Sequence, residues 1–363
     1  MKVFHAAETI KGGVATVLNN LAVYQKDNNK IDKITILIPK EHLSELSPAL
    51  NDSITTFNRK KRNTFSLFNF SISFFKIVKS FQPDIVHLHS TYAGFLGRLI
   101  LYFFFHKNKI KIIYCPHAFA FLMDTSKFKR KFYNICEINL SKITERIICV
   151  GENEYHDAIL WGIPKNKLIL INNGVDIPKN KNVKTHNKLD EYLLLYVGRF
   201  DYQKGIDIFI DALKIIDREK LNYKIKVILI GETVNEDMDY KSVKFENIDI
   251  KYTGWINREL VIDYYRQADC LIIPSRWEGF AMVPLEAISY YLPIITSDIP
   301  AFNTINKISG LSFKKGDSKS LANILARLNE YDLDSAKEKL MGKLLITYTK
   351  DIMNEQTLDL YVR

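Results

Sequence analysis

Cysteine is scarce in this chain, with four among 363 residues, and no two of them form a C-x-x-C pair. Buried, reduced thiols in a cytosolic protein explain this pattern better than a disulfide scaffold or a zinc site does. Long apolar runs are also missing, since a dense one such as 99–105 is far shorter than the ~20 residues that a membrane-spanning helix needs. Residues 1–13 lack the apolar core of a signal peptide. We therefore expect a soluble or peripheral cytoplasmic protein.

What the chain does have is a normal globular balance, with 47% hydrophobic and 25% charged residues over a length that suggests two domains. Its positive charge is one-sided. Residues 1–180 hold 25 Lys and Arg against 14 Asp and Glu, a net charge of +11, whereas residues 181–363 hold 26 against 27, a net charge of −1. A basic first half indicates an anionic partner, which could be nucleic acid, an acidic substrate or an anionic lipid. The alternative is a basic surface that only contacts solvent.

Short β-rich apolar runs alternate with helical patterns along nearly the whole chain. The expected strands are 2–5, 33–38, 84–89, 110–114, 146–150 and 167–171 in a first series, and 192–197, 226–230, 248–252, 270–273 and 293–296 in a second. The polar segment 178–188 separates the two series. Strands that alternate with helices form parallel sheets through right-handed crossovers. We predict an α/β protein with two doubly wound Rossmann-like domains that face a central cleft.

The expected domains are 1–178 and 188–345, followed by a terminal helix at 346–363 that crosses back to the first domain. In open α/β sheets, ligands bind beyond the carboxyl ends of the strands, so the residues that directly follow strands are the functional candidates. After the first strand, Gly12 and Gly13 open a helical pattern. Two glycines let a ligand approach the backbone, and a helix N-terminus offers N–H groups to an anion. Alone this signal is weak, because such a pair is often only a tight turn.

The segment 197–205, VGRFDYQKG, ends the first strand of the second series. Arg199 is expected to leave the strand tip, and Lys204 to lie where the next helix starts. Two cations beside a helix N-terminus form a strong clamp for a diphosphate, because its charge meets both full charges and fixed dipoles. The alternative is two basic residues that face solvent. Their place on a strand-to-helix loop favours the clamp.

The segment 274–287, PSRWEGFAMVPLEA, is the most specific. Gly279 permits a tight turn, and the proline at 284 is tolerated in the first turn of a helix. Glu278 is then expected in the loop and Glu286 about one turn inside the helix. One carboxylate can accept hydrogen bonds from sugar hydroxyls and the other from ribose hydroxyls. Free N–H groups between them can face a phosphate, and these belong to Phe280, Ala281 and Met282. Two charges on a helix surface are the alternative.

Together, GGV, VGRFDYQKG and EGFAMVPLEA resemble the retaining glycosyltransferases of family 4, which have the GT-B architecture. The resemblance extends over most of the chain and includes DIVHLHS at 84–90, PHAF at 116–119 and INNGVD at 171–176. The combination of GR-x4-K with a downstream E-x7-E is far more specific than either element alone. The resemblance implies a metal-independent hexosyltransferase that retains the configuration of the transferred sugar, with a UDP-sugar favoured as donor.

The resemblance also implies roles at matching positions. Arg199 and Lys204 neutralise the diphosphate, Glu278 orients the sugar, and Glu286 binds the ribose. Four further positions follow: Gly13 donates its N–H to the distal phosphate beside Gly12, His117 lies near the reacting face of the sugar, and Ile256, within 254–257, contacts the base. Fixed positive charge stabilises a leaving diphosphate as its negative charge grows, so no metal ion or other cofactor is required.

Two acidic or histidine clusters invite a metal interpretation that we do not favour. His87 and His89 form an H-x-H at a strand end, but the sequence shows no third ligand near them, and a packing or site-lining role is preferred. Asp237 and Asp239 lie in a polar insertion away from the inferred donor loops.

Two segments mix basic and aromatic residues, at 58–76 and 127–133. Such segments can bind anionic membrane surfaces. They predict a peripheral enzyme on the inner face of the cytoplasmic membrane with a lipid-linked saccharide acceptor, as in bacterial O-antigen, capsule or lipopolysaccharide assembly. Alternatively, the aromatics are core and only the cations reach solvent. Nothing resembles a nucleic-acid module.

Two other functions stay open. Within the same architecture, the chain could be a nucleotide-sugar epimerase or a sugar synthase. From another class, it could be a non-catalytic subunit that only binds a sugar nucleotide. The joint presence of Arg199, Lys204, Glu278 and Glu286 argues against the inactive subunit.

Overall fold

A computed structural model describes residues 1–59, 61, 63–123, 125–178, 190–219, 221–233 and 240–362. The chain divides into two compact units, Met1–Gly174 with Lys350–Arg363, and Val175–Thr349. The predicted linker lies outside the described residues except for Pro178, and so do Asp237 and Asp239. The terminal helix α12 (Lys350–Val362) is part of the first unit.

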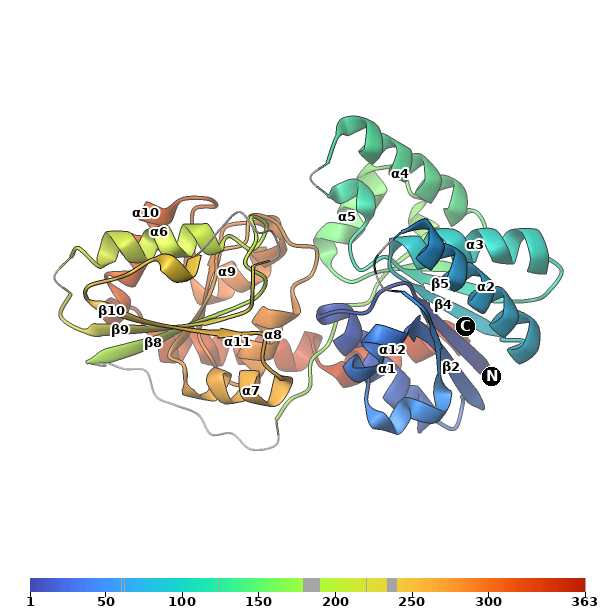
Figure 1. Cartoon of the computed structure of the whole chain (residues 1–363), viewed down its shortest axis with the longest axis horizontal. Coiled ribbons are helices and arrows are strands. Elements are labelled where there is room, and N and C mark those ends of the chain that lie inside the picture. The colour runs from blue at the N-terminus through green and yellow to red at the C-terminus, as the bar shows by residue number, and fades with distance from the viewer. Residues whose placement is uncertain are drawn as a thin grey trace. The chain divides into compact units, whose positions relative to one another are not determined.

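The first unit contains a parallel sheet of seven strands in the order β3-β2-β1-β4-β5-β6-β7 (Figure 1). The strands are β1 (Lys2–Ala7), β2 (Lys33–Pro39), β3 (Ile54–Phe57), β4 (Ile85–His89), β5 (Lys111–Cys115), β6 (Arg146–Cys149) and β7 (Leu168–Leu170). The order reverses between β1 and β4. Ligands of doubly wound sheets bind at such a reversal, beyond the carboxyl ends of the two strands.

Helices cover both faces of this sheet. They are α1 (Gly13–Lys26), α2 (Thr64–Phe81), α3 (Thr91–Phe105), α4 (Lys127–Ser141) and α5 (Glu152–Leu160), with α12 beside α1 and α2 beside α3 (Figure 1). Alternate side chains of a strand point to opposite faces. Phe4 in β1 therefore packs with Phe74 of α2, with ring centroids 5.2 Å apart, whereas His5 faces Gln25 of α1.

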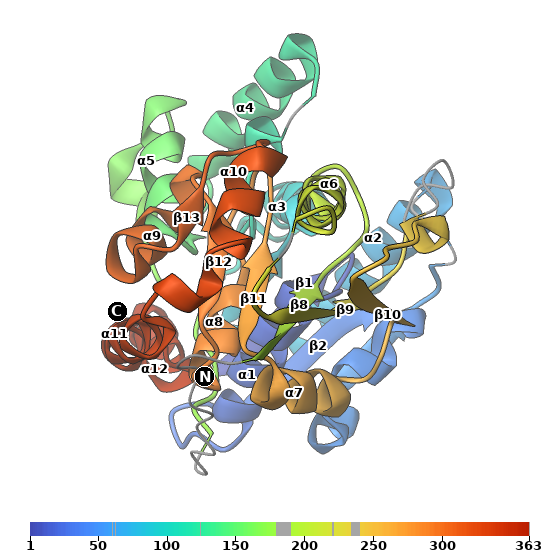
Figure 2. The same ribbon diagram turned by 90° about the vertical axis from the view of Figure 1, so that its left-hand side faces the viewer.

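The second unit repeats the same design with six parallel strands in the order β10-β9-β8-β11-β12-β13 (Figure 2). The strands are β8 (Glu191–Val197), β9 (Lys224–Ile230), β10 (Ile248–Gly254), β11 (Cys270–Ile273), β12 (Ile294–Ser297) and β13 (Ser312–Phe313). Their buried Leu, Ile and Val residues form near-continuous apolar runs, as expected of strands that are covered on both faces. The reversal lies between β8 and β11.

The helices of the second unit are α6 (Ile206–Ile216), α7 (Arg258–Gln267), α8 (Met282–Ser289), α9 (Asn303–Ser309), α10 (Ser318–Leu325) and α11 (Leu333–Thr347). Figure 2 shows α6 and α10 on one face of the sheet and α7 on the other. The prediction of two doubly wound Rossmann-like domains is confirmed, although the short edge strands β3 and β13 were not expected. Within the described residues, no helix has both the length and the apolarity needed to cross a bilayer.

Candidate functional site

The loop between β8 and α6 is held against the end of β11 by a glycine. Gly205 has a φ of 67°, and a Cβ atom at this position would lie 2.0 Å from the carbonyl oxygen of Pro274. Only glycine combines this left-handed conformation with so close an approach. The contact brings the loop that carries Lys204 next to the loop that carries Glu278, at the reversal point of the sheet.

Gly205→Ala is expected to lower the free energy of unfolding by about 2–4 kcal/mol, because backbone strain and overpacking each cost about 1–3 kcal/mol. Gly342→Ala is the control, since Gly342 lies within α11 and the added Cβ would have no atom within 4 Å beyond its chain neighbours and the nearby backbone of its own helix. Alanine there should stabilise the helix by about 0.5–1 kcal/mol. Urea denaturation of both variants measures the difference, and equal stability would contradict the close contact.

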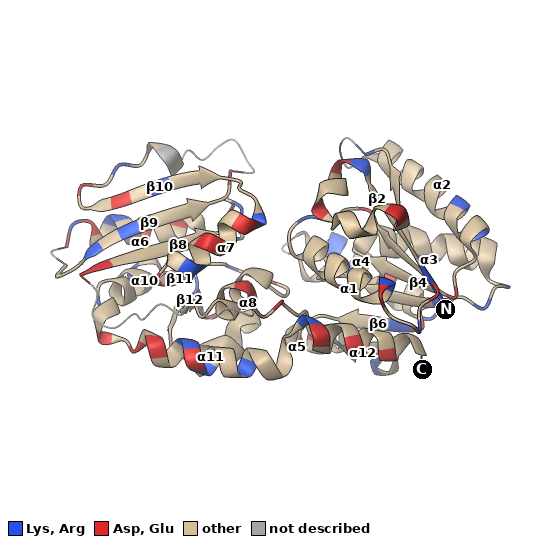
Figure 3. Cartoon of the chain, turned by 90° about the horizontal axis from the view of Figure 1, so that it is seen from below, with Lys and Arg blue, Asp and Glu red and all other residues tan. Residues whose placement is uncertain are grey.

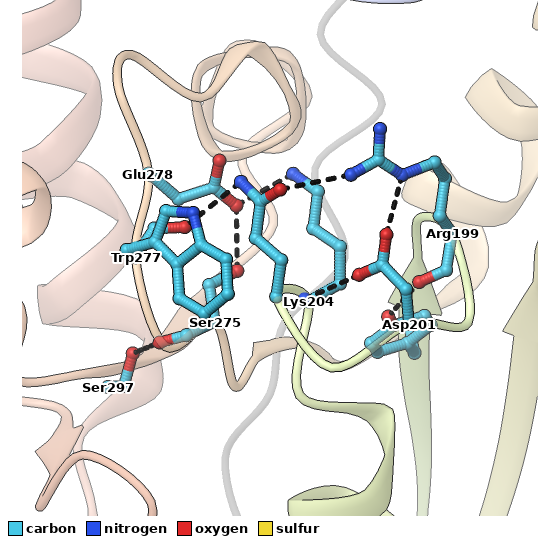
Figure 4. A network of polar contacts seen from close by, with 9 residues as sticks. Arg199, Asp201, Lys204, Ser275, Trp277, Glu278 and Ser297 are labelled. Carbon is cyan, nitrogen blue, oxygen red and sulfur yellow. Dashed lines mark hydrogen bonds and ion pairs between the residues drawn. The ribbon is translucent and has the colours of Figure 1, made fainter. Parts of the chain in front are cut away.

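A polar network joins these two loops (Figure 4). The ammonium group of Lys204 lies 2.7 Å from Oε1 of Glu278, and the hydroxyl of Ser275 donates to the same oxygen at 2.7 Å. Asp201 accepts from the backbone N–H of Lys204 at 2.8 Å and from Nε of Arg199 at 2.7 Å. The Glu278 side chain is only 7% exposed, whereas Arg199 is 47% exposed. Lys204 and Glu278 are thus held in place, and Arg199 is the accessible cation.

Further contacts position this network from the outside. The guanidinium of Arg276 donates to both carboxylate oxygens of Asp207 and lies 3.8 Å from the ring centroid of Tyr202. The side-chain amide of Gln203 donates to the carbonyl oxygen of Trp277 at 3.2 Å and accepts from Arg199 at 3.0 Å. The motifs contain these residues, but their spacing did not reveal that Arg276 and Gln203 link the two loops.

Glu286 belongs to a separate group of contacts. It lies on α8, where the hydroxyl of Tyr265 donates to Oε2 at 3.4 Å and Arg258 lies 3.9 Å from Oε1. Burial raises the pKa of Glu286, and Arg258 opposes that shift. The two predicted carboxylates thus have different partners, a cation and a serine for Glu278 and a phenol and a cation for Glu286. Sequence reasoning missed both Tyr265 and Arg258.

The start of α8 has the backbone geometry that the sequence predicts. Gly279 and Phe280 lie half-buried in the loop, and Met282 is the first residue of the helix. The N-cap residue is Ala281, which provides no capping side chain. The first N–H groups of an α-helix have no partner within the helix. Ile256, the candidate for the base, is half-buried in the loop between β10 and α7.

The first unit has a similar helix start after β1. Gly12 is the N-cap of α1, with a φ of 59° and no capping side chain, and Gly13 is the first helical residue. No acidic residue lies in the first turn. The positive end of the helix is therefore not neutralised locally, which suits an anion.

His117 follows β5 in a strained backbone segment, because its φ is 55° and that of Ala118 is 138°. Residues other than glycine adopt such values at a cost of about 1–3 kcal/mol and do so mainly at functional sites. The ring of His117 is hydrogen bonded through Nε2 to Nδ1 of His89 at 3.1 Å. Burial lowers the pKa of His117 to about 4, so the ring is neutral at pH 7.

The sheet supplies a third histidine beside the H-x-H motif. His5 of β1 pairs in register with His87, and the three residues His5, His87 and His89 offer ring nitrogens within 4.8 Å of one another. The sequence showed no third ligand because His5 lies 82 positions before His87. Two of the three rings are hydrogen bonded to each other, His5 Nδ1 to His89 Nε2 at 3.0 Å. That bond favours a polar network, and the absence of a metal stays a prediction.

The two doubly wound parallel sheets define a two-domain α/β protein. At the reversal point of the second sheet lie cations, a carboxylate and the uncapped start of α8. Such a set of groups suits a phosphorylated, hydroxyl-rich ligand. Residues 11–179 match glycosyltransferase family 4, and residues 178–340 match the glycosyl transferases group 1. The chain therefore belongs to these glycosyltransferases, and the predicted family resemblance is confirmed.

The chain is also similar to individual proteins and solved structures. An uncharacterized 41.2 kDa protein of the cps region of Klebsiella pneumoniae is 35% identical, over 90% of this chain and 89% of the relative. The Escherichia coli UDP-Gal:alpha-D-GlcNAc-diphosphoundecaprenol alpha-1,3-galactosyltransferase is 29% identical, over 71% and 70%. Among solved structures, Anabaena HepE in complex with UDP has a TM-score of 0.75 at 15% identity and covers 99% of both chains, which shows a shared GT-B fold.

Proposed function

We propose that this glycosyltransferase moves a sugar from a nucleoside diphosphate sugar, with a UDP-sugar favoured, to a lipid-linked saccharide in the assembly of a bacterial surface polysaccharide such as capsule or O-antigen. The observation that carries the proposal is the Lys204–Glu278 ion pair at the reversal point of the second sheet. The name of the Escherichia coli relative includes a UDP-sugar and a lipid diphosphate, and other relatives are named for capsular polysaccharide biosynthesis.

In the proposed reaction, the bond between the anomeric carbon and the phosphate oxygen breaks while a bond to the acceptor oxygen forms. Arg199 and Lys204 stabilise the leaving diphosphate, because their attraction grows with its negative charge. The acceptor oxygen bonds to the face of the sugar from which the diphosphate departs, so the configuration is retained, and the acceptor's proton passes to the leaving phosphate oxygen on that face. No protein nucleophile and no metal ion takes part.

The other predicted residues bind the substrate. No described residue bonds Oε2 of Glu278, so this oxygen can accept hydrogen bonds from sugar hydroxyls. Glu286 holds the ribose, and Ile256 contacts the base. The starts of α8 and α1 offer backbone N–H groups to phosphate, the latter through Gly13. His117 offers a ring nitrogen to a sugar hydroxyl.

A panel of nucleotide sugars tests this function. The purified protein should release nucleotide slowly from one of them, and faster when bacterial lipid-linked saccharides are added. Interconversion of epimeric nucleotide sugars would instead identify an epimerase. Binding without turnover, in the presence of the lipid extract, would identify a non-catalytic subunit.

We also propose that the first unit binds an anionic membrane surface through α2, α3 and α4. The large apolar side chains exposed on these helices are Phe65, Phe68 and Ile72 on α2, Tyr102, Phe103 and Phe104 on α3, and Phe128, Phe132 and Ile135 on α4. Among the described aromatic residues of the first predicted segment, only Phe70 and Phe74 are fully buried in the core. The core explanation therefore applies to part of the segment alone.

The charge of these helices fits an anionic bilayer. Figure 3 shows α2 with basic residues and no acidic ones, and the described basic residues at the start of α4 include Lys127, Lys129 and Lys131. The prediction that Arg59 belongs to a membrane-binding basic segment is corrected. Its guanidinium is bound by Glu8 and Glu41 at 2.9 Å each and does not project freely. Its neighbours Lys60 and Arg62 lie outside the described residues.

The double substitution Phe128→Ser/Phe132→Ser is expected to weaken binding to vesicles that contain phosphatidylglycerol by about tenfold or more, because burying one aromatic side chain contributes about 1.5–3 kcal/mol. Ile346→Ser is the control, because Ile346 is 73% exposed on α11 of the other unit, and this variant should bind as the parent protein does. Vesicle co-sedimentation measures both. Equal binding of the two variants would contradict a membrane role for α4. So would a parent protein that binds neutral vesicles as strongly as those that contain phosphatidylglycerol.

A further inference from the structure

A chain of hydrogen bonds runs through the first unit from His117 to the C-terminal helix. His117 Nε2 bonds His89 Nδ1 at 3.1 Å, and His89 Nε2 bonds His5 Nδ1 at 3.0 Å. His5 Nε2 bonds Oε1 of Gln25 at 2.7 Å, and Nε2 of Gln25 donates to the hydroxyl of Tyr361 at 3.3 Å. Apart from His117, every member is buried.

With the amide oxygen of Gln25 toward His5, each bond between the histidines has one direction. Oε1 of Gln25 can only accept, so His5 must carry its hydrogen on Nε2. A neutral His5 then has a lone pair on Nδ1, which accepts from Nε2–H of His89. A neutral His89 in turn has a lone pair on Nδ1 and accepts from Nε2–H of His117. Burial keeps these rings neutral, since it lowers the pKa of His5 to about 4 and that of His89 well below its usual range.

Tyr361 and His87 together select the orientation of the Gln25 amide, because the tyrosine hydroxyl donates to Nδ1 of His87 when that ring carries its hydrogen on Nε2. The tyrosine hydroxyl lies 2.6 Å from Nδ1 of His87 and can donate its one hydrogen there. It then accepts from the NH2 group of Gln25, which leaves the amide oxygen for His5. Without this hydroxyl, either end of the amide could face His5.

We propose that Gln25 and Tyr361 are positioning residues that fix His117 as the Nε2–H tautomer, so that its Nδ1 presents a lone pair to a hydroxyl group of the sugar substrate. No described residue bonds this nitrogen. The role in substrate binding rests on the proposed glycosyl transfer, whereas the tautomer does not. The inference also gives α12 a role. Its residue Tyr361 lies 336 positions beyond Gln25 in the sequence and, through Gln25, decides which nitrogen of His117 carries the hydrogen.

Long-range ¹H–¹⁵N correlation spectra of the full chain with ¹⁵N-labelled histidine test the tautomer without any substrate. The His117 signals are assigned by their loss in His117→Gln. We expect a protonated Nε2 and an unprotonated Nδ1 at pH 7. In Gln25→Met, and in the milder variant Tyr361→Phe, both nitrogens should move to the averaged shifts of mixed tautomers. Tyr102→Phe, which changes an exposed tyrosine on α3, is the matched control and should leave the spectrum unchanged.

Activity supplies the second measurement. With the nucleotide sugar that is turned over, Gln25→Met and Tyr361→Phe should lower kcat/KM by about tenfold, the effect of one lost hydrogen bond, while the Kd for UDP stays the same. A Nδ1–H tautomer in the parent protein, or an unchanged tautomer in both variants, would overturn the inference. So would a stoichiometric metal ion on His5, His87 and His89, because it would replace the bond between His5 and His89. If no nucleotide sugar is turned over while the tautomer shifts as expected, the proposed function fails and the tautomer assignment stands.

Discussion

Lys204→Ala is expected to lower kcat for donor turnover by about 10²–10³-fold, the usual effect of removing one preorganised group that stabilises developing negative charge. The ammonium group is held 2.7 Å from Glu278 and is 24% exposed, so it is both positioned and partly shielded from water. Its removal also leaves Glu278 buried without its cation, which disturbs the carboxylate that is proposed to hold the sugar. Glu278→Ala should therefore cause a loss of similar size.

Lys214→Ala is the matched control, because Lys214 lies on the neighbouring helix α6 and pairs with Asp211 at 47% exposure. It should keep full activity. Arg199→Ala should cost less than Lys204→Ala, since its guanidinium is more exposed and already bonded to Asp201 and Gln203. Initial rates of nucleotide release measure all four variants, and thermal unfolding confirms that they are folded. Full activity of Lys204→Ala or Glu278→Ala would refute the site.

Glu137→Leu is expected to lower the free energy of unfolding by about 3–5 kcal/mol, the cost of leaving a buried charge without its partner. Nη2 of Arg98 on α3 lies 2.7 Å from Oε2 of Glu137 on α4, and both side chains are at most 5% exposed. The hydroxyl of Tyr114 donates to the other carboxylate oxygen at 3.2 Å, and the guanidinium lies 4.0 Å from that tyrosine ring. This pair joins α3 and α4, two helices that also carry exposed aromatic side chains.

The double variant Arg98→Met/Glu137→Leu should recover part of the lost stability, because it removes both buried charges. Glu330→Leu is the control, since Glu330 and Arg327 form an exposed pair, and such pairs contribute about 0–1 kcal/mol. Urea denaturation followed by circular dichroism compares the three. A loss below about 1 kcal/mol in Glu137→Leu would show that the buried pair contributes little.

Much of the second unit's site could be predicted because it depends on local patterns. Apolar runs that alternate with helical segments mark the strand ends, and the sequence places Arg199, Lys204 and Glu278 directly after such ends. Carboxyl ends of parallel strands lie at one edge of the sheet, so the approach of Lys204 to Glu278 across 74 positions follows from the strand order. Their direct ion pair does not follow, since it requires the close packing of Gly205 on Pro274.

Other features could not be predicted from local patterns. The strands β3 and β13 are short edge strands, and the second has only two residues, which is too few for a recognisable pattern. His5 carries no signal by itself, because it is an ordinary residue of a buried strand until the register of β1 and β4 places it beside His87. The sequence alone assigns Arg59 to a basic surface, because only the fold places Glu8 next to it.

The sequence by itself determined the two parallel sheets, the family, and the residues that follow the strands, because periodicity and turn-forming residues act over a few positions. The tertiary structure decided which charged and polar groups meet: Lys204 with Glu278, Glu286 with Tyr265, and the histidines with Tyr361, which lies 274 positions beyond His87. Such pairings depend on strand register and helix packing across the whole unit. A hydrogen bond requires its two atoms within about 3 Å, and no local pattern specifies that distance.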